Sequence, residues 1–152
     1  MDIQIVIKDF MDSVEEEISR IAAGSYSEDG APLYDGMKKT SRDDGTMERL
    51  FSESLTTLKN ALARFLEGSE QKDGKLSIVL AASGRRIRGK EDMIEDLVKS
   101  SLAKVLISKY FLEKQQTEQA TKFDTLAAAD LQALQNVIYT KSTPTYNTMT
   151  TA

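Results

Sequence analysis

Residues 76–91 of the chain read LSIVLAASGRRIRGKE. An apolar run from Leu76 to Ala82 leads into Gly84-x-x-x-x-Gly89-Lys90, and the residues that follow have the pattern of an amphipathic helix. This order is close to the strand, glycine-containing loop and helix of a phosphate-binding P-loop. The stretch is therefore compatible with two folds: an α/β nucleotide-binding fold, and a helical fold that contains one short strand.

The P-loop interpretation fails on its own chemical requirements. A P-loop places a Ser or Thr hydroxyl after the lysine to bind Mg²⁺, but Glu91 occupies that position and its carboxylate would face phosphate. A P-loop domain also needs several parallel strands, whereas residues 76–80 are the one clear strand of this sequence. The sequence therefore argues against a nucleotide-hydrolysing enzyme.

Four helical stripes surround the strand and predict a mainly α fold. Apolar residues recur at intervals of three and four, which is the period of a helix with one buried face. The predicted helices are residues 3–23, 46–67, 91–114 and 117–140. Apolar side chains cover most of the circumference of the third helix, so we expect it to be central or at an interface. Residues 1–140 are therefore predicted to form a single four-helix, bundle-like domain with one short β-strand or hairpin.

Three segments fall outside the helical pattern. Residues 24–45 form a long polar loop that holds Leu33 and Tyr34, residues 75–90 combine the strand with a basic loop, and residues 141–152 form an extended Thr-rich tail. The strand must find a hydrogen-bonding partner, because its backbone groups cannot stay unpaired when they are buried. The sequence offers Leu33-Tyr34 as a weak partner, so we expect either a small hairpin or pairing with another chain.

The composition excludes several classes of site. The sequence has 152 residues, no cysteine and no histidine, so disulfides, thiolate metal sites and histidine general bases are absent. A Glu-x-x-His di-iron motif is also missing, which leaves a carboxylate-only Mg²⁺ or Ca²⁺ site as the alternative to no metal. The first residues lack the pattern of a signal peptide, and no apolar run approaches the ~20 residues needed to span a bilayer. We expect no enzyme activity, no cofactor, no membrane contact and assembly in the cytoplasm.

The charge is distributed unevenly along the chain. Residues 1–68 carry 8 basic and 14 acidic side chains, and residues 69–152 carry 12 basic and 10 acidic ones. Such asymmetry suits a subunit that meets copies of itself or a charged partner, or else two solvated faces of a monomer. Arg85, Arg86, Arg88 and Lys90 form a basic cluster, which is either a solvated loop, a contact for an acidic protein surface or a contact for nucleic-acid phosphates.

Four stretches carry a family resemblance: residues 43–50 (DDGTMERL), 93–102 (MIEDLVKSSL), 110–114 (YFLEK) and 138–144 (IYTKSTP). Together they resemble small helical proteins encoded in phages and prophages of gut Bacteroidetes. More loosely, the order and length of the helices over roughly residues 40–140 resemble the head–tail connector (adaptor) family of tailed phages. The long first loop and the Thr-rich tail depart from the connector pattern, so adaptor, stopper and tail-terminator roles are not separated.

The resemblance implies a structural virion protein without enzymatic activity. It implies a homo-oligomeric ring, commonly of twelve subunits, that joins portal and tail or stopper proteins in the virion after assembly in the cytoplasm of the bacterial host. The basic cluster is then expected to face an acidic partner or DNA in the channel. The residues predicted to contact neighbouring subunits are Leu33, Tyr34, Leu76, Ile78, Leu80 and Tyr146. The alternative function is a small regulatory module that binds nucleic acid through residues 85–90.

Overall fold

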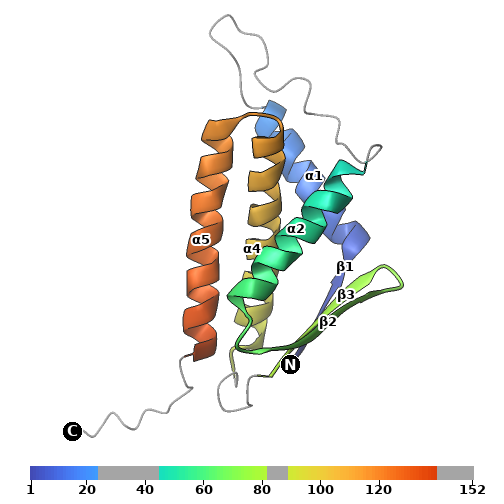
Figure 1. The fold of residues 1–152 in the computed structure, drawn as a ribbon, viewed down its shortest axis with the longest axis vertical. Coiled ribbons are helices and arrows are strands. Elements are labelled where there is room, and N and C mark those ends of the chain that lie inside the picture. The colour runs from blue at the N-terminus through green and yellow to red at the C-terminus, as the bar shows by residue number, and fades with distance from the viewer. Residues whose placement is uncertain (24–44, 82–88, 140–152) are drawn as a thin grey trace, which may run out of the picture.

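The computed structural model describes residues 1–23, 45–81 and 89–139 (Figure 1). In chain order the elements are β1 (Asp2–Val6), α1 (Ile7–Ala23), α2 (Thr46–Ala61), β2 (Leu66–Lys72), β3 (Lys75–Leu80), α4 (Glu91–Glu113) and α5 (Thr117–Tyr139). The described residues thus form four helices and one three-stranded antiparallel sheet, which confirms the predicted mainly α fold with a short hairpin. The predicted loop 24–45, apart from Gly45, and the predicted tail 141–152 lie outside these residues.

The helix α4 is the centre of the molecule. It packs against α5 along its length and also contacts α2 and α1 (Figure 1). Buried side chains therefore point from α4 in several directions, and Tyr110 and Phe111 are both fully buried. This agrees with the nearly all-round apolar pattern of its sequence. The predicted bounds of α4 and α5 differ from the observed ones by a single residue at the C-terminal end of each helix.

The first predicted helix, residues 3–23, is wrong at its start. Residues 2–6 form the strand β1, in which Ile3 and Ile5 are buried while the alternate residues are exposed. The predicted helix counted Ile3 and Ile7 as one helical interval, but the alternation of Asp2-Ile3-Gln4-Ile5-Val6 has the period of a half-buried strand. The helix α1 begins only at Ile7.

The second predicted helix, residues 46–67, is too long at its end. The helix α2 ends at Ala61, and Leu66 already belongs to β2. Residues 72–75 form a two-residue hairpin connection, in which Asp73 has φ of 53° and Gly74 has φ of 75°. Positive φ at both central residues is typical of the type I′ turn, whose twist matches that of the flanking strands. The turn therefore brings the polar segment LEGSEQK into the sheet beside β3.

The strand β3 has both of its partners within the chain. The sheet order is β1-β3-β2, so β3 is the central strand and pairs antiparallel with both neighbours. The prediction that this strand pairs with Leu33-Tyr34 or with another chain is therefore wrong. Leu76, Ile78 and Leu80 are at most 1% exposed and belong to the core, so we correct their predicted role as contacts to neighbouring subunits.

Candidate functional site

The two edges of the sheet differ in how well they are protected. The outer edge strand β2 carries Glu67, Glu70 and Lys72 and has a register shift between Leu66 and Gly68. Charged side chains and bulges are two of the devices that prevent an edge strand from pairing with a further chain. The other edge strand, β1, has the sequence DIQIV, with one charged residue at its start and a regular register with β3. The edge of β1 is therefore the less protected of the two.

The hydrogen-bond pattern shows which backbone groups β1 directs outward. Met1 and Leu80 exchange hydrogen bonds of 3.1 and 2.8 Å, and the amide of Ile7 donates to the carbonyl of Gly74 over 2.9 Å. Because bonded and non-bonded pairs alternate in an antiparallel ladder, Ile3 and Ile5 also bond inward to β3. The N–H and C=O groups of Asp2 and Gln4 and the N–H of Val6 therefore point away from the sheet, and no described strand lies on that side. The C=O of Val6 instead is at the start of α1, where it accepts the first hydrogen bond of the helix.

A groove runs from the edge of β1 between α1 and α4. Its first section has a volume of 480 Å³ and is lined by β1 residues together with Phe10 and Val14 of α1. Its second section, of 680 Å³, continues along the same two helices as far as Ile107 of α4 and Phe123 of α5. The two sections share the residues Ser13, Val14, Ser100 and Ala103. We call the two sections together the β1 groove.

Small side chains explain why the groove is open. Ser13 on α1 faces Ser100 and Ala103 on α4, and these side chains are too short to fill the space between the two helices. Where longer side chains occupy the equivalent space on the other side of α1, the helices are bridged: Phe10 and Phe51 meet edge to face with their ring centroids 5.7 Å apart. A hollow of 440 Å³ remains on that side as well, between α1 and α2, and is lined by Met11 and Phe51. The β1 groove therefore differs from it by the edge of β1 that borders the groove.

Ion pairs form the polar rim of the groove. Lys104 of α4 bonds Asp130 of α5 over 2.8 Å, and the hydroxyl of Ser100 donates to the same carboxylate over 2.6 Å. Burial raises the pKa of Asp130, but the hydrogen bonds from Lys104 and Ser100 and the charge of Lys104 outweigh it, so this pKa lies below its ordinary value. Lys99 is paired with Glu95 over 2.8 Å. The rim thus presents paired charges around an apolar floor.

The start of β1 is fixed on the solvent face of the sheet. The hydroxyl of Ser77 donates to one oxygen of Asp2 over 2.7 Å, and the side-chain amide of Gln4 donates to the other oxygen over 3.1 Å. The hydrogen bond from Ser77, followed by that from Gln4, holds the pKa of Asp2 below its ordinary value. The carboxylate is therefore engaged across the sheet with β3 rather than directed out from the edge.

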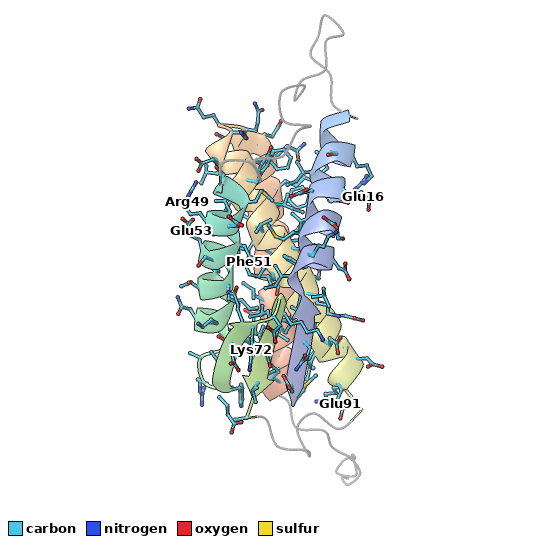
Figure 2. All side chains as sticks on the ribbon, turned by 90° about the vertical axis from the view of Figure 1, so that its right-hand side faces the viewer. Glu16, Arg49, Phe51, Glu53, Lys72 and Glu91 are labelled. Carbon is cyan, nitrogen blue, oxygen red and sulfur yellow. The ribbon has the colours of Figure 1, made fainter. Side chains whose placement is uncertain are left out.

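The opposite side of the molecule carries a polar clamp between α2 and α4. Arg49 bonds Glu53 one turn further along α2 and Glu113 at the end of α4, each over 3.0 Å. Figure 2 shows Arg49 and Glu53 together on the outer face of α2, while Phe51 points toward the interior. The hydrogen bonds with Glu113 and Glu53 raise the pKa of Arg49. This clamp joins elements of the chain's own body and leaves the β1 groove as the site with unused backbone donors and acceptors.

The described residues among those predicted from sequence do not line the β1 groove. Lys90, the described member of the basic cluster, precedes α4 and donates from its ammonium to the carbonyl of Val137 near the end of α5 over 3.3 Å. The other members, Arg85, Arg86 and Arg88, lie outside the described residues. So do three of the residues predicted to contact neighbouring subunits, namely Leu33, Tyr34 and Tyr146.

The sequence interpretation missed the groove because it missed β1. The signal was present in the alternating pattern of residues 2–6, with Ile3 and Ile5 on one face and Gln4 and Val6 on the other. The small residues Ser100 and Ala103 gave no such signal, because a small side chain on a helix is equally typical of a close helix contact and of a gap. Only the three-dimensional arrangement distinguishes the two.

Comparison with known proteins found no matching family model, no matching curated protein and no matching solved structure. Within the described ranges, no helix combines the length and hydropathy required to cross a bilayer. The same ranges contain no group of three or more carboxylates placed to hold a metal ion.

Proposed function

We propose that this chain is a structural virion protein, a subunit of an oligomeric head–tail connector ring that joins the portal to the tail. The observation that carries the proposal is the open edge of β1 beside an apolar groove. A free strand edge offers backbone donors and acceptors in a row, which is the feature that recognises another polypeptide rather than a small substrate. The order of the helices, which resembles that of the connector family, supports the specific role.

The body of the molecule suits such a role. The clamp of Arg49 with Glu53 and Glu113 and the pair of Lys104 with Asp130 join α2, α4 and α5 to one another. A ring subunit transmits load between the portal and the tail or stopper proteins, so it needs helices that hold their positions while the edges contact neighbours. In this proposal the protein is non-enzymatic, binds no cofactor and resides in the virion after assembly in the host cytoplasm.

The first test measures assembly and location. The purified chain is examined by size-exclusion chromatography with light scattering across a hundredfold range of concentration, and phage particles are analysed by mass spectrometry. We expect closed oligomers that negative-stain microscopy shows as rings, and peptides of this chain in the particle. A protein that stays monomeric at every concentration, together with its absence from particles, contradicts the proposal.

The alternative function is nucleic-acid binding through residues 85–90, and a gel-shift series separates it from the structural role. The wild type is compared with the triple variant Arg85→Ala/Arg86→Ala/Arg88→Ala. A control of equal charge, Lys72→Ala/Lys75→Ala/Lys122→Ala, removes three exposed lysines elsewhere. Salt-sensitive binding that only the arginine variant loses assigns a nucleic-acid contact to the basic cluster. Binding that both variants lose equally reflects bulk charge alone.

A further inference from the structure

We infer that the edge of β1 receives the Thr-rich segment 142–152 of a second copy as a fourth strand, whose inward side chains enter the β1 groove. This inference rests on the proposed function, because it names the contact between subunits of the proposed oligomer. It combines three independent features: the unprotected edge, the space beside it and the composition of the segment.

The helical layer extends beyond the edge of the sheet. The residues Lys99, Ser100 and Ala103 of α4 line the groove on the side of β1 that faces away from β3. A strand added beside β1 would therefore lie beneath α4. Strands in a sheet are about 4.8 Å apart, so the new strand would occupy the space that the small side chains leave open. One face of that strand would be covered and the other would face solvent.

The backbone of β1 can bond such a strand. Asp2 and Gln4 each direct one N–H and one C=O outward, and Val6 directs its N–H outward, while the C=O of Val6 is at the start of α1. The side chain of Val6 is 43% exposed at this edge and would gain apolar contacts when the edge is covered. The other edge, on β2, lacks these properties because of its charges and its register shift.

The segment after α5 has the composition of such a strand. Residues 140–152 contain six threonines and Tyr146, one proline at Pro144 and a single charged side chain, that of Lys141. β-Branched and aromatic residues favour strands, and Pro is tolerated at the start of an edge strand. The eight residues after Pro144 reach about 26 Å when extended, against about 17 Å for β1. In an extended segment Tyr146, Thr148 and Thr150 share one face, which places one large ring in a groove section of 480 Å³.

The arrangement of the helices favours a second copy as the source. The helix α5 ends on one side of α4, whereas β1 and α1 lie on the other side (Figure 1). A segment that starts at the end of α5 must therefore pass around its own α4 before it reaches the edge of β1. The same segment of a neighbouring copy meets no such obstacle. Each subunit would then donate one strand and accept one, which is a head-to-tail contact that can close into a ring.

The first experiment removes the segment without touching the body. A chain that ends at Lys141 is compared with the full chain by size-exclusion chromatography with light scattering. A synthetic peptide of residues 142–152 is then titrated into the shortened protein. We expect the full chain to be oligomeric, the shortened chain to be monomeric, and the peptide to bind with at least tenfold slower hydrogen exchange at the amides of Gln4 and Val6. Peptide binding that protects another segment, or no binding at all, overturns the inference.

The second experiment tests the edge itself with matched prolines. Val6→Pro removes an outward amide of β1, and Ser69→Pro removes an outward amide of β2 on the opposite edge. Peptide binding should fall at least tenfold in the first variant and stay within twofold in the second. If Val6→Pro fails to fold by circular dichroism, Ser100→Phe, which fills the groove from α4, replaces it and should weaken peptide binding by the same factor. Equal binding to all folded variants overturns the inference.

Two outcomes separate this inference from the proposed function. Oligomers that persist in the shortened chain leave the connector role standing and overturn the strand exchange. The full chain could instead be monomeric, with the amides of Gln4 and Val6 protected until the segment is removed. That result places the segment on its own body and overturns the exchange between copies.

Discussion

Substitution of Ile78 tests whether β3 belongs to the core of the chain or to a contact between chains. Ile78 is 1% exposed and lies in the middle of the central strand, paired with Ile3 on one side and Ser69 on the other. Ile78→Ala removes buried methyl groups and leaves a cavity, which costs about 3 kcal/mol in a packed core. For a chain of this size we expect the melting temperature to fall by about 6–12 °C.

The matched control is the next residue along the same strand. Val79 is only half-buried and points to the opposite face of the sheet, so Val79→Ala should cost less than about 1 kcal/mol. Both variants are unfolded in urea at two protein concentrations a hundredfold apart. With a slope near 2 kcal/mol/M, the midpoint of Ile78→Ala should fall by about 1.5 M at both concentrations.

Two results would refute this reasoning. Equal shifts for Ile78→Ala and Val79→Ala would mean that the inward and outward faces of β3 are assigned wrongly. A shift for Ile78→Ala that appears only at high protein concentration would place this side chain between subunits, because association contributes stability only through mass action.

Three further substitutions, one of them with a matched control, probe an ion pair, the hairpin turn and a buried hydroxyl. Asp130→Asn should lower the free energy of unfolding by about 1 kcal/mol at pH 7. The pKa of Asp130 is lowered in the folded protein, so the wild type should lose this advantage as the pH falls from about 4 through that lower pKa, and urea titrations at each pH measure the loss. Gly74→Ala should cost about 1 kcal/mol in thermal unfolding because φ is +75°, whereas Gly68→Ala, which has no atom within 4 Å of the added Cβ and no positive φ, should be nearly neutral. Ser108→Ala should cost about 1 kcal/mol by urea unfolding, since its hydroxyl bonds a carbonyl of α5 over 2.9 Å.

The long helices could be predicted from the sequence because many residues repeat the same signal. In α4 and α5 the apolar period persists over 23 residues each, so a single ambiguous position does not change the interpretation. The strands β1 and β2 are short and had competing explanations. Ile3 and Ile7 also fit a helical interval, and the segment LEGSEQK has little strand propensity of its own. The segment LEGSEQK is a strand because the Asp73-Gly74 turn places it beside β3. Pairing with β3, and not the segment's own strand propensity, therefore determines its conformation.

The candidate site could not be predicted from the sequence for a related reason. Its components are the edge of β1, one face of α1 and the small residues of α4. The residues of α4 follow those of β1 by roughly a hundred positions in the chain. None of the three segments carries a chemical motif. The basic cluster, by contrast, is conspicuous in the sequence, and its described member Lys90 bonds the chain's own carbonyl at Val137.

The position of β1 also sets an order in which the chain can fold during synthesis. Met1 and Leu80 are bonded to each other although 79 positions separate them, so β1 has no partner during synthesis until β3 has left the ribosome. Until then Ile3 and Ile5 are exposed to water, and closing the loop to β3 costs entropy before any contact repays it. The hairpin of β2 and β3 closes through a two-residue turn and can form first. The N-terminal strand is therefore the last piece of the sheet to be added, although it is the first to be made.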